Sequence, residues 1–592
     1  MRHVFGRLTA GRTVDDARAE WSALWRSALA TSASGHLPAG MAERRLVVAP
    51  GATGASVWRA RYQGPLEITM VASAWLVIIA CANLAGLQLT RVLRRAREIA
   101  ISRALGATQA DVMWPTALES LLLCSVGLLL GAPLAAWGAR VATDLLSTGS
   151  VPLDLDLRAD GRTWAMVAGL ATLVTLVAGL MPAWLAARGT GGLAPDARVV
   201  SGAGRASSAL VAGQISLAVM LLTGTVVTVD ALLRVALRDH GFAADHVVVA
   251  QLMNRPGGYA DLDDAVYYRA LIDRIERLPG VSAVALAKPV PGLSSRALEE
   301  SVTGPGVPDG VEASIVMASP GYFDLLGIPL LVGRTFEWRD SAGSPLVAVI
   351  SRALAGALMP GGFTPGLRID VGRRPHHRAL EVVGIADDAS VLNVRDAAPR
   401  VVYVGALQQP PPMARWPGLI VRTPLGIQSV TPAIAHVLDQ LGHEFVLGAD
   451  ALSGHITRSL ARERLLAMMA LVYGLLAMSM VAIGLWALLA HEVTRRVREF
   501  GVRLSLGASP AALHRAVTAR AVKLATAGLA AGATATWMLS RALTASASLD
   551  WHVSSWAVAG ACGLLLLLTV CAATGPARRA ARTEPMAALR SE

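Results

Sequence analysis

Charged and aromatic residues are scarce in this chain of 592 residues. Only 16% of the residues are Asp, Glu, Lys or Arg and 5% are aromatic, whereas 54% are hydrophobic and the mean hydropathy is +0.49. Because soluble globular proteins carry more charge, this composition excludes an ordinary soluble protein and favours a membrane protein. Lysine occurs only at Lys288 and Lys523, so arginine supplies nearly all the basic residues behind the net charge of +12.

Cysteine is also rare, and its placement excludes a cysteine-based framework. Cys81, Cys124, Cys562 and Cys571 all lie inside apolar runs. A thiol in such a run usually packs as a small hydrophobe. We therefore expect neither a disulfide framework nor a metal site.

Long apolar runs are what the sequence does contain. A hydrocarbon core of roughly 30 Å takes about 20 mostly apolar residues of helix. Seven runs satisfy this length, at residues 66–90, 116–139, 164–187, 207–229, 465–490, 518–538 and 555–574. The sixth run is the weakest, because it is rich in alanine and carries Lys523.

Arginine placement predicts the orientation. Arginines crowd the loops 91–114, 188–206 and 491–517 and the C-terminal tail, whereas loop 142–163 on the other side is mainly acidic. By the positive-inside rule the arginine-rich side is cytoplasmic, so residues 1–65 and 230–464 lie outside and the C-terminus inside. One interpretation of each arginine is that it only keeps its loop in the cytoplasm. Nucleic-acid binding is disfavoured, because the basic residues sit beside membrane spans.

Two of the arginine-rich loops are copies of one another. One reads RRAREIAISRALGATQADV from Arg94 and the other RRVREFGVRLSLGASPAAL from Arg495. A duplicated stretch of this kind indicates an internal repeat. Its matched positions are our candidate docking residues: Arg94, Arg95, Arg97, Glu98, Leu105, Gly106, Arg495, Arg496, Arg498, Glu499, Leu506 and Gly507.

The repeat predicts a helix, a sharp turn and a returning helix. Gly106 and Gly507 suit a left-handed C-terminal cap. Thr108 and Ser509 suit the N-cap of the next helix, with Pro510 in its first turn. We call each unit an elbow (residues 94–108 and 495–509). Its duplication favours docking of a cytoplasmic partner, and the alternative is an interfacial turn that only anchors the spans.

These residues resemble the FtsX/MacB superfamily of ABC-transporter permeases, most closely its tandem-duplicated (ADOP-like) bacterial subgroup. The resemblance rests on both elbows, on ACANLAGLQLTR from Ala80, on GYFDLLGIPLLVGRTF from Gly321 and on the closing PARRAARTEPMAALRSE from Pro576. It implies that the elbows act as coupling helices that grip an ATPase on another chain. The sequence contains no G-x-x-x-x-G-K-[ST] motif, so ATP and its hydrolysis are expected from a separate subunit.

The expected fold is a polytopic α-helical membrane protein, with about seven transmembrane helices in two FtsX-like blocks and an α+β extracytoplasmic MacB-like core domain. We expect residues 1–65 to be the C-terminal remnant of a first periplasmic core domain, either truncated or a split or decaying copy. The other predicted parts are a first three-helix block (66–190), a linker with a fourth transmembrane helix (191–233), the core domain (234–462) and a second block with a cytoplasmic tail (463–592). Strand-like runs such as LVAVIS from Leu346, and the amphipathic YYRALIDRIERL from Tyr267, support the α+β pattern.

Other polar residues receive structural interpretations. His376 and His377 are adjacent and lack further ligands, so a metal site there is disfavoured. Asp387 and Asp388 are expected in a solvated turn, and Gln408 in a loop or linker that runs on to residues 410–412. Asn83, Glu119 and Gln214 lie in or near spans, where polar groups are costly. We expect Glu119 to pair with a loop arginine such as Arg103.

The sequence therefore favours a permease of the bacterial inner membrane that couples ATP hydrolysis elsewhere to motion of its outer domain, for efflux or export. The alternatives are a mechanical relay that regulates an envelope partner, and an inactive remnant of a duplicated permease. Catalytic residues and a bound cofactor are not expected. Expected partners are a cytoplasmic ABC ATPase, the bilayer, a periplasmic partner and a second permease unit in a homodimer or pseudo-dimer, and not nucleic acid.

Overall fold

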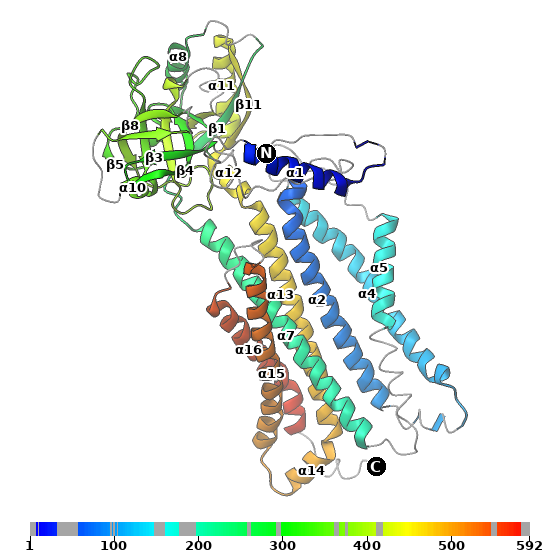
Figure 1. Ribbon diagram of the computed structural model, residues 1–592. Helices are drawn as coiled ribbons and strands as arrows, with labels where there is room; N and C mark the ends of the chain where they lie inside the picture. The colour runs from blue at the N-terminus through cyan, green and yellow to red at the C-terminus, as the bar shows by residue number, and fades with distance from the viewer. Residues whose placement is uncertain are drawn as a thin grey trace. The chain divides into compact units, whose positions relative to one another are not determined.

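The computed structural model describes residues 8–9, 11–31, 57–94, 98, 101–102, 105–146, 160–176, 197–256, 262–291, 298–359, 366–372, 377–409, 418–545 and 553–581 (Figure 1). Two compact units, residues 1–78 and 79–592, are described separately. The first holds α1 (Val14–Thr31) and the beginning of α2 (Val57–Arg94). Thr13 and Asp16 cap α1 reciprocally through 2.9 and 3.2 Å hydrogen bonds.

Five described helices are long and apolar enough to cross a membrane. Their apolar segments are 66–89 in α2, 117–143 in α4 (Gln109–Leu146), 207–236 in α7 (Ala197–Ala236), and the whole of α13 (Ala461–Arg495) and α16 (Ser555–Ala581). They confirm five of the predicted spans. The predicted span 164–187 begins inside α5 (Gly161–Val174), and residues 177–187 lie outside the described part.

The predicted span 518–538 forms the middle of a helix, α15 (Pro510–Ala545), but it is less apolar than the five others. Its alanines, threonines and glycines lower the mean hydropathy, and their small side chains leave a flat helix surface. Ala521 and Ala525 are fully buried, and α15 packs along both α7 and α16. Small residues of this kind let helix backbones approach closely in a membrane. Together with α13 these helices form the bundle of the second block (Figure 1).

The core domain between α7 and α13 is built on one sheet of eleven strands. The strands are β1 (Val247–Asn254), β2 (Ala283–Lys288), β3 (Leu298–Gly304), β4 (Val307–Ala318), β5 (Leu330–Gly333), β6 (Val347–Ser351), β7 (Arg368–Val371), β8 (Arg378–Ala386), β9 (Val401–Gly405), β10 (Gly418–Arg422) and β11 (Glu444–Ala451). Interspersed helices are α8 (Asp264–Glu276), α9 (Tyr322–Leu326), α10 (Arg352–Leu358), the 3-10 turn η3 (Ala406–Gln408), α11 (Ile427–Leu441) and α12 (Leu452–Ser459).

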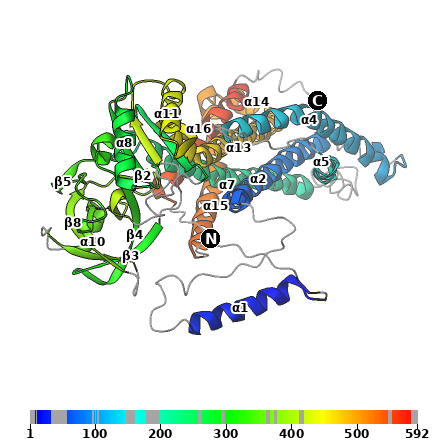
Figure 2. The same cartoon turned by 90° about the horizontal axis from the view of Figure 1, so that it is seen from above.

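The strand pairings divide this sheet into two lobes. The order β11-β1-β10-β2-β4 is open, whereas β4-β3-β7-β8-β6-β9 closes on itself, because β4 also pairs in parallel with β9. Helices α8 and α11 lie side by side on the open lobe (Figure 2), where Leu271 and Ile434 are fully buried against its strands. The predicted α+β pattern is confirmed.

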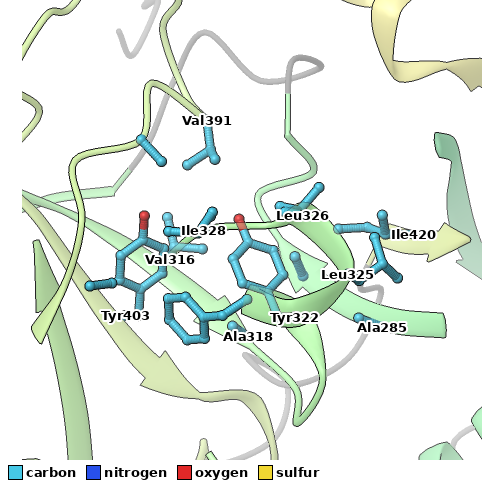
Figure 3. Close-up of a cluster of buried hydrophobic side chains, with 14 of the residues drawn as sticks. Ala285, Val316, Ala318, Tyr322, Leu325, Leu326, Ile328, Val391, Tyr403 and Ile420 are labelled. Atoms are coloured by element: carbon cyan, nitrogen blue, oxygen red, sulfur yellow. The ribbon is translucent and has the colours of Figure 1, made fainter. Parts of the chain in front are cut away.

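Another apolar cluster lies around α9. The Phe323 ring meets the Tyr403 ring edge-on at 4.9 Å between centroids, and Tyr322 lies 6.0 Å from Tyr403 (Figure 3). Burial raises the pKa of both tyrosines above the usual value of 10.0. These three side chains come from the GYFDLLGIPL stretch and from β9, so they join the two lobes into one domain.

Candidate functional site

The first elbow follows α2 and turns at Gly106, whose φ of +100° is in the left-handed region that favours glycine. The amide of Ala107 donates to the carbonyl of Ser102 at 3.0 Å, which is the six-residue bond of a Schellman cap. The hydroxyl of Thr108 then accepts from the amide of Asp111 at 3.3 Å as α4 begins. The predicted cap and N-cap are both confirmed.

The second elbow repeats this geometry. α13 ends at Arg495, the short helix α14 (Val497–Ser505) follows, and Gly507 turns the chain with φ +92°. The amide of Ala508 donates to the carbonyl of Arg503 at 2.9 Å, the counterpart of the bond between Ala107 and Ser102. Ser509 caps α15, and Pro510 is its first residue as predicted.

Each elbow presents an exposed leucine at the turn. Leu105 is 84% exposed and Leu506 is 81% exposed, and they occupy matched positions of the repeat. Ile101 and Val502, one helical turn earlier, are also exposed. Because residues four apart lie on one side of a helix, each elbow carries an apolar tip. Phe500, in contrast, is buried.

The described charges of the second elbow are largely engaged with one another. Arg503 pairs with Glu499 at 2.5 Å, and Arg496 pairs with Glu492 at 3.2 Å. In the first elbow Glu98 is exposed. The side chains of Arg94, Arg95, Arg97 and Arg498 lie outside the described part of the chain. The apolar tip is therefore the best-defined common surface of the two elbows.

Glu119 forms an ion pair, but with Arg91 of α2. The predicted partner, Arg103, lies outside the described residues. Next to this pair the Gln88 amide donates to the Ser120 hydroxyl at 2.9 Å, and both side chains are buried. The prediction of structural pairing for Glu119 is confirmed, and the partner is a residue on the preceding helix.

Asn83 and Gln214 meet beside Gly484 of α13. The Asn83 amide donates to the carbonyl of Met480 at 2.9 Å, which ties α2 to α13. A Cβ at Gly484 would lie 2.4 Å from Asn83 Oδ1 and 2.7 Å from Gln214 Oε1, so the two amides fit only because position 484 is glycine. Gly484 is the repeat counterpart of Asn83, a relationship that sequence reasoning missed although the alignment of the blocks contains it.

A junction at Arg395 joins the core domain to the helices. The Arg395 guanidinium donates to Glu463 Oε1 at 2.8 and 3.0 Å and to the Ser459 carbonyl at 2.7 Å, at the start of α13. Arg238, which follows the end of α7, donates to the carbonyl of Arg395 at 3.4 Å. Sequence analysis missed this junction, because its partners are far apart in the chain.

Some predictions for the core domain need correction. Asp387 and Asp388 do not form a solvated turn: Asp387 pairs with Arg352 at 2.5 Å and Asp388 accepts from the amide of Ala353 at 2.8 Å, at the start of α10. Gln408 is buried and not part of a linker. Its Oε1 accepts from the amide of Val347 at 3.1 Å, because a buried amide must be paired.

His376 lies outside the described residues, as do residues 410–417. Among the residues that the structure describes, no group of three His, Cys, Asp or Glu side chains could hold a metal ion.

Comparison with known proteins gives matches to both parts of this architecture. Residues 70–190 and 471–585 match the family described as FtsX-like permease C-terminal, and residues 208–427 match the MacB-like periplasmic core domain. A curated relative, "Macrolide export ATP-binding/permease protein MacB 2" from Aeromonas hydrophila, is 23% identical over 294 residues, which cover 47% of this chain and 43% of that protein. The chain thus matches less than half the length of that relative.

Solved structures similar to the chain include two outer domains of transporters. One is the periplasmic region of MacB from Actinobacillus actinomycetemcomitans (14% identity, TM-score 0.25, covering 35% of this chain and 90% of that one). The other is the extracellular domain of the noncanonic ABC-type transporter YknZ from Gram-positive bacteria (16% identity, TM-score 0.24, covering 34% and 100%).

Two FtsX-like blocks on either side of a MacB-like periplasmic core domain define a multi-pass permease of the inner membrane, with the outer domain on the periplasmic side. The chain belongs to the FtsX/MacB family of permeases, and is a membrane permease component of an ABC-type system.

Proposed function

We propose that the two elbows lie in the cytoplasm and dock a separate ABC ATPase, whose ATP turnover drives the permease to export a substrate. The observation that carries this proposal is the pair of matched apolar tips at Leu105 and Leu506, each held on a rigid glycine-capped turn. A protein partner can bury such a leucine in a pocket, as the centres of protein interfaces do.

The helix α13 offers a route for the motion. It is continuous for 35 residues, or about 50 Å at 1.5 Å per residue. One end continues into the second elbow, and the other end is bonded to Arg395 of the core domain. A movement imposed on the elbow would therefore reach the core domain through one rigid element. The expected working assembly is a homodimer or pseudo-dimer of permease units around the ATPase, with the C-terminus in the cytoplasm.

Replacement of Leu105 and Leu506 by Asp tests this proposal. We expect each single variant to weaken co-purification with a candidate ABC ATPase, and the double variant to bind at least roughly 30-fold more weakly, as loss of a buried interface leucine would predict. Leu237→Asp is the matched control, because Leu237 is 80% exposed just after α7, near the core domain.

If the elbows only anchor the spans in lipid, the double variant will lose membrane stability and keep its ATPase. That result would contradict the docking proposal. The same variants distinguish export from regulation of a partner. If loss of docking leaves export in a deletion strain unaffected but changes the activity of an envelope enzyme, the permease regulates a partner and does not export a substrate.

A further inference from the structure

Helices α4 and α15 carry the same pair of glycines. Gly127 and Gly131 of α4 correspond to Gly528 and Gly532 of α15, at the spacing in sequence that relates Gly106 to Gly507. In both helices the glycines are four residues apart, a spacing at which small residues let a second transmembrane helix come close.

In the second block this pair of glycines is occupied by α7. A Cβ on Gly528 would lie 2.7 Å from the carbonyl oxygen of Ala212 and 2.8 Å from Ile215 Cβ. A Cβ on Gly532 would lie 2.7 Å from Val219 Cβ and 2.8 Å from the carbonyl oxygen of Ser216. Backbone contacts this close exist only because both positions lack a side chain. The two glycines of α15 are thus a seat for a helix.

In the first block the matched seat has no neighbour among the described residues. No described atom lies within 4 Å of a Cβ placed on Gly127 or Gly131. No residue of the most apolar stretch of α4 is buried by other described residues. The surrounding side chains are apolar and exposed, with Leu130 at 71% and Leu134 at 65%. The repeat therefore contains two seats of the same kind, one filled by α7 and one that no described part of the chain covers.

We propose that the Gly127–Gly131 face of α4 docks a transmembrane helix of the α7 type that lies outside the residues described in this structure. The filled seat specifies the chemistry of this helix, namely small and β-branched residues on one face at the spacing of Ala212, Ile215, Ser216 and Val219. A second copy of the chain does not readily supply its own α7, because α7 already lies against α13 and α15.

A synthetic peptide of residues 205–236 is the probe for this seat. It carries a small diazirine-bearing aliphatic side chain in place of that at position 219, and is reconstituted with the full chain in lipid nanodiscs. Irradiation followed by peptide mapping should give adducts within residues 109–146. The variant Gly127→Leu/Gly131→Leu should lose at least about nine-tenths of this adduct, because its side chains fill the groove. Leu122→Phe/Leu129→Phe adds bulk to the opposite face of α4 and should keep it.

Three results would overturn the proposal: adducts only within residues 510–545, where the peptide would be replacing α7; no adducts at all; or an α4 to α4 cross-link between two chains that excludes the peptide, which would make a second copy the occupant. The experiment needs no ATPase, so its outcome is independent of the proposed docking function.

Discussion

Glu492 of α13 forms a 2.8 Å ion pair with Arg520 of α15. In the first block the same two places are taken by Arg91 and Glu119, which also pair, with acid and base exchanged. In both blocks an ion pair thus joins the first two helices at the end where the elbow begins. The two blocks differ only in which helix carries the acid and which the base. The acid at position 119 is not duplicated as a residue, but the interaction is.

The exchange predicts how charge reversal will act. Arg520→Glu should lower the free energy of unfolding by on the order of 1 kcal/mol, because it places two acids together and leaves Glu492 with Arg496 alone. The double variant Glu492→Arg/Arg520→Glu should recover most of this loss, since it copies the first block. Thermal unfolding in detergent measures both. Arg515→Glu, at an exposed position of the same helix, is the control; no recovery in the double variant would show that the pair itself is not stabilising.

Replacement of the elbow glycines is expected to destabilise the turns. Gly106→Ala and Gly507→Ala should each cost about 1–2 kcal/mol locally, because alanine is strained at a positive φ. Gly213→Ala, in an open helical position of α7, should be neutral or stabilising. Limited proteolysis within residues 101–109 and 502–510 reports the local opening. If all three variants were cleaved by the protease as slowly as one another, the turns would be shown to tolerate another backbone conformation.

Arg395→Ala should uncouple the core domain from α13 while leaving the ATPase bound. Its guanidinium holds Glu463 and the Ser459 carbonyl, and alanine removes all of these bonds. The expected result is loss of any nucleotide-dependent change in proteolysis of the core domain. Arg352→Ala removes an ion pair inside the domain and serves as the control. A preserved nucleotide response in Arg395→Ala would mean that motion travels by another route.

The core domain should lose stability as the pH falls through the range of histidine titration. Burial and then the neighbouring Arg458 lower the pKa of His455 from 6.5, against the opposing effect of Asp450. Because the folded state binds this proton more weakly than the unfolded state, stability is complete above pH 6.5 and declines as the pH drops below it towards the folded pKa. Thermal unfolding between pH 7.5 and 5.5 should show a smaller decline for His455→Gln, whereas His436→Gln, at an exposed position, should behave as the parent.

Much of the architecture follows from local patterns. Apolar length identifies α2, α4, α7, α13 and α16, because a helix in a membrane needs that length whatever its neighbours. The elbows follow from Gly106 and Gly507, since a positive φ and a Schellman cap depend on a few adjacent residues. The docking role of the elbow residues stays a prediction.

Predictions failed where the partners are distant in the sequence. The Asp387-Asp388 pair was expected in solvent, but its binding to Arg352 and to the start of α10 depends on how the strands are arranged. Gln408 was placed in a loop, although its side chain accepts from the first amide of β6. A local polar pattern does not distinguish a turn that faces solvent from one whose side chains hydrogen-bond to residues distant in the sequence.

Hydropathy, arginine bias and the repeat established a two-block membrane protein with an outer domain, because these signals lie within single helices and turns. Packing between helices established the rest: α15 is held by its glycines on α7, Gly484 makes room for Asn83 and Gln214, and Arg395 binds the start of α13. Each of these contacts joins residues from separate segments, so their fit depends on where the folded backbones lie and not on any local sequence pattern.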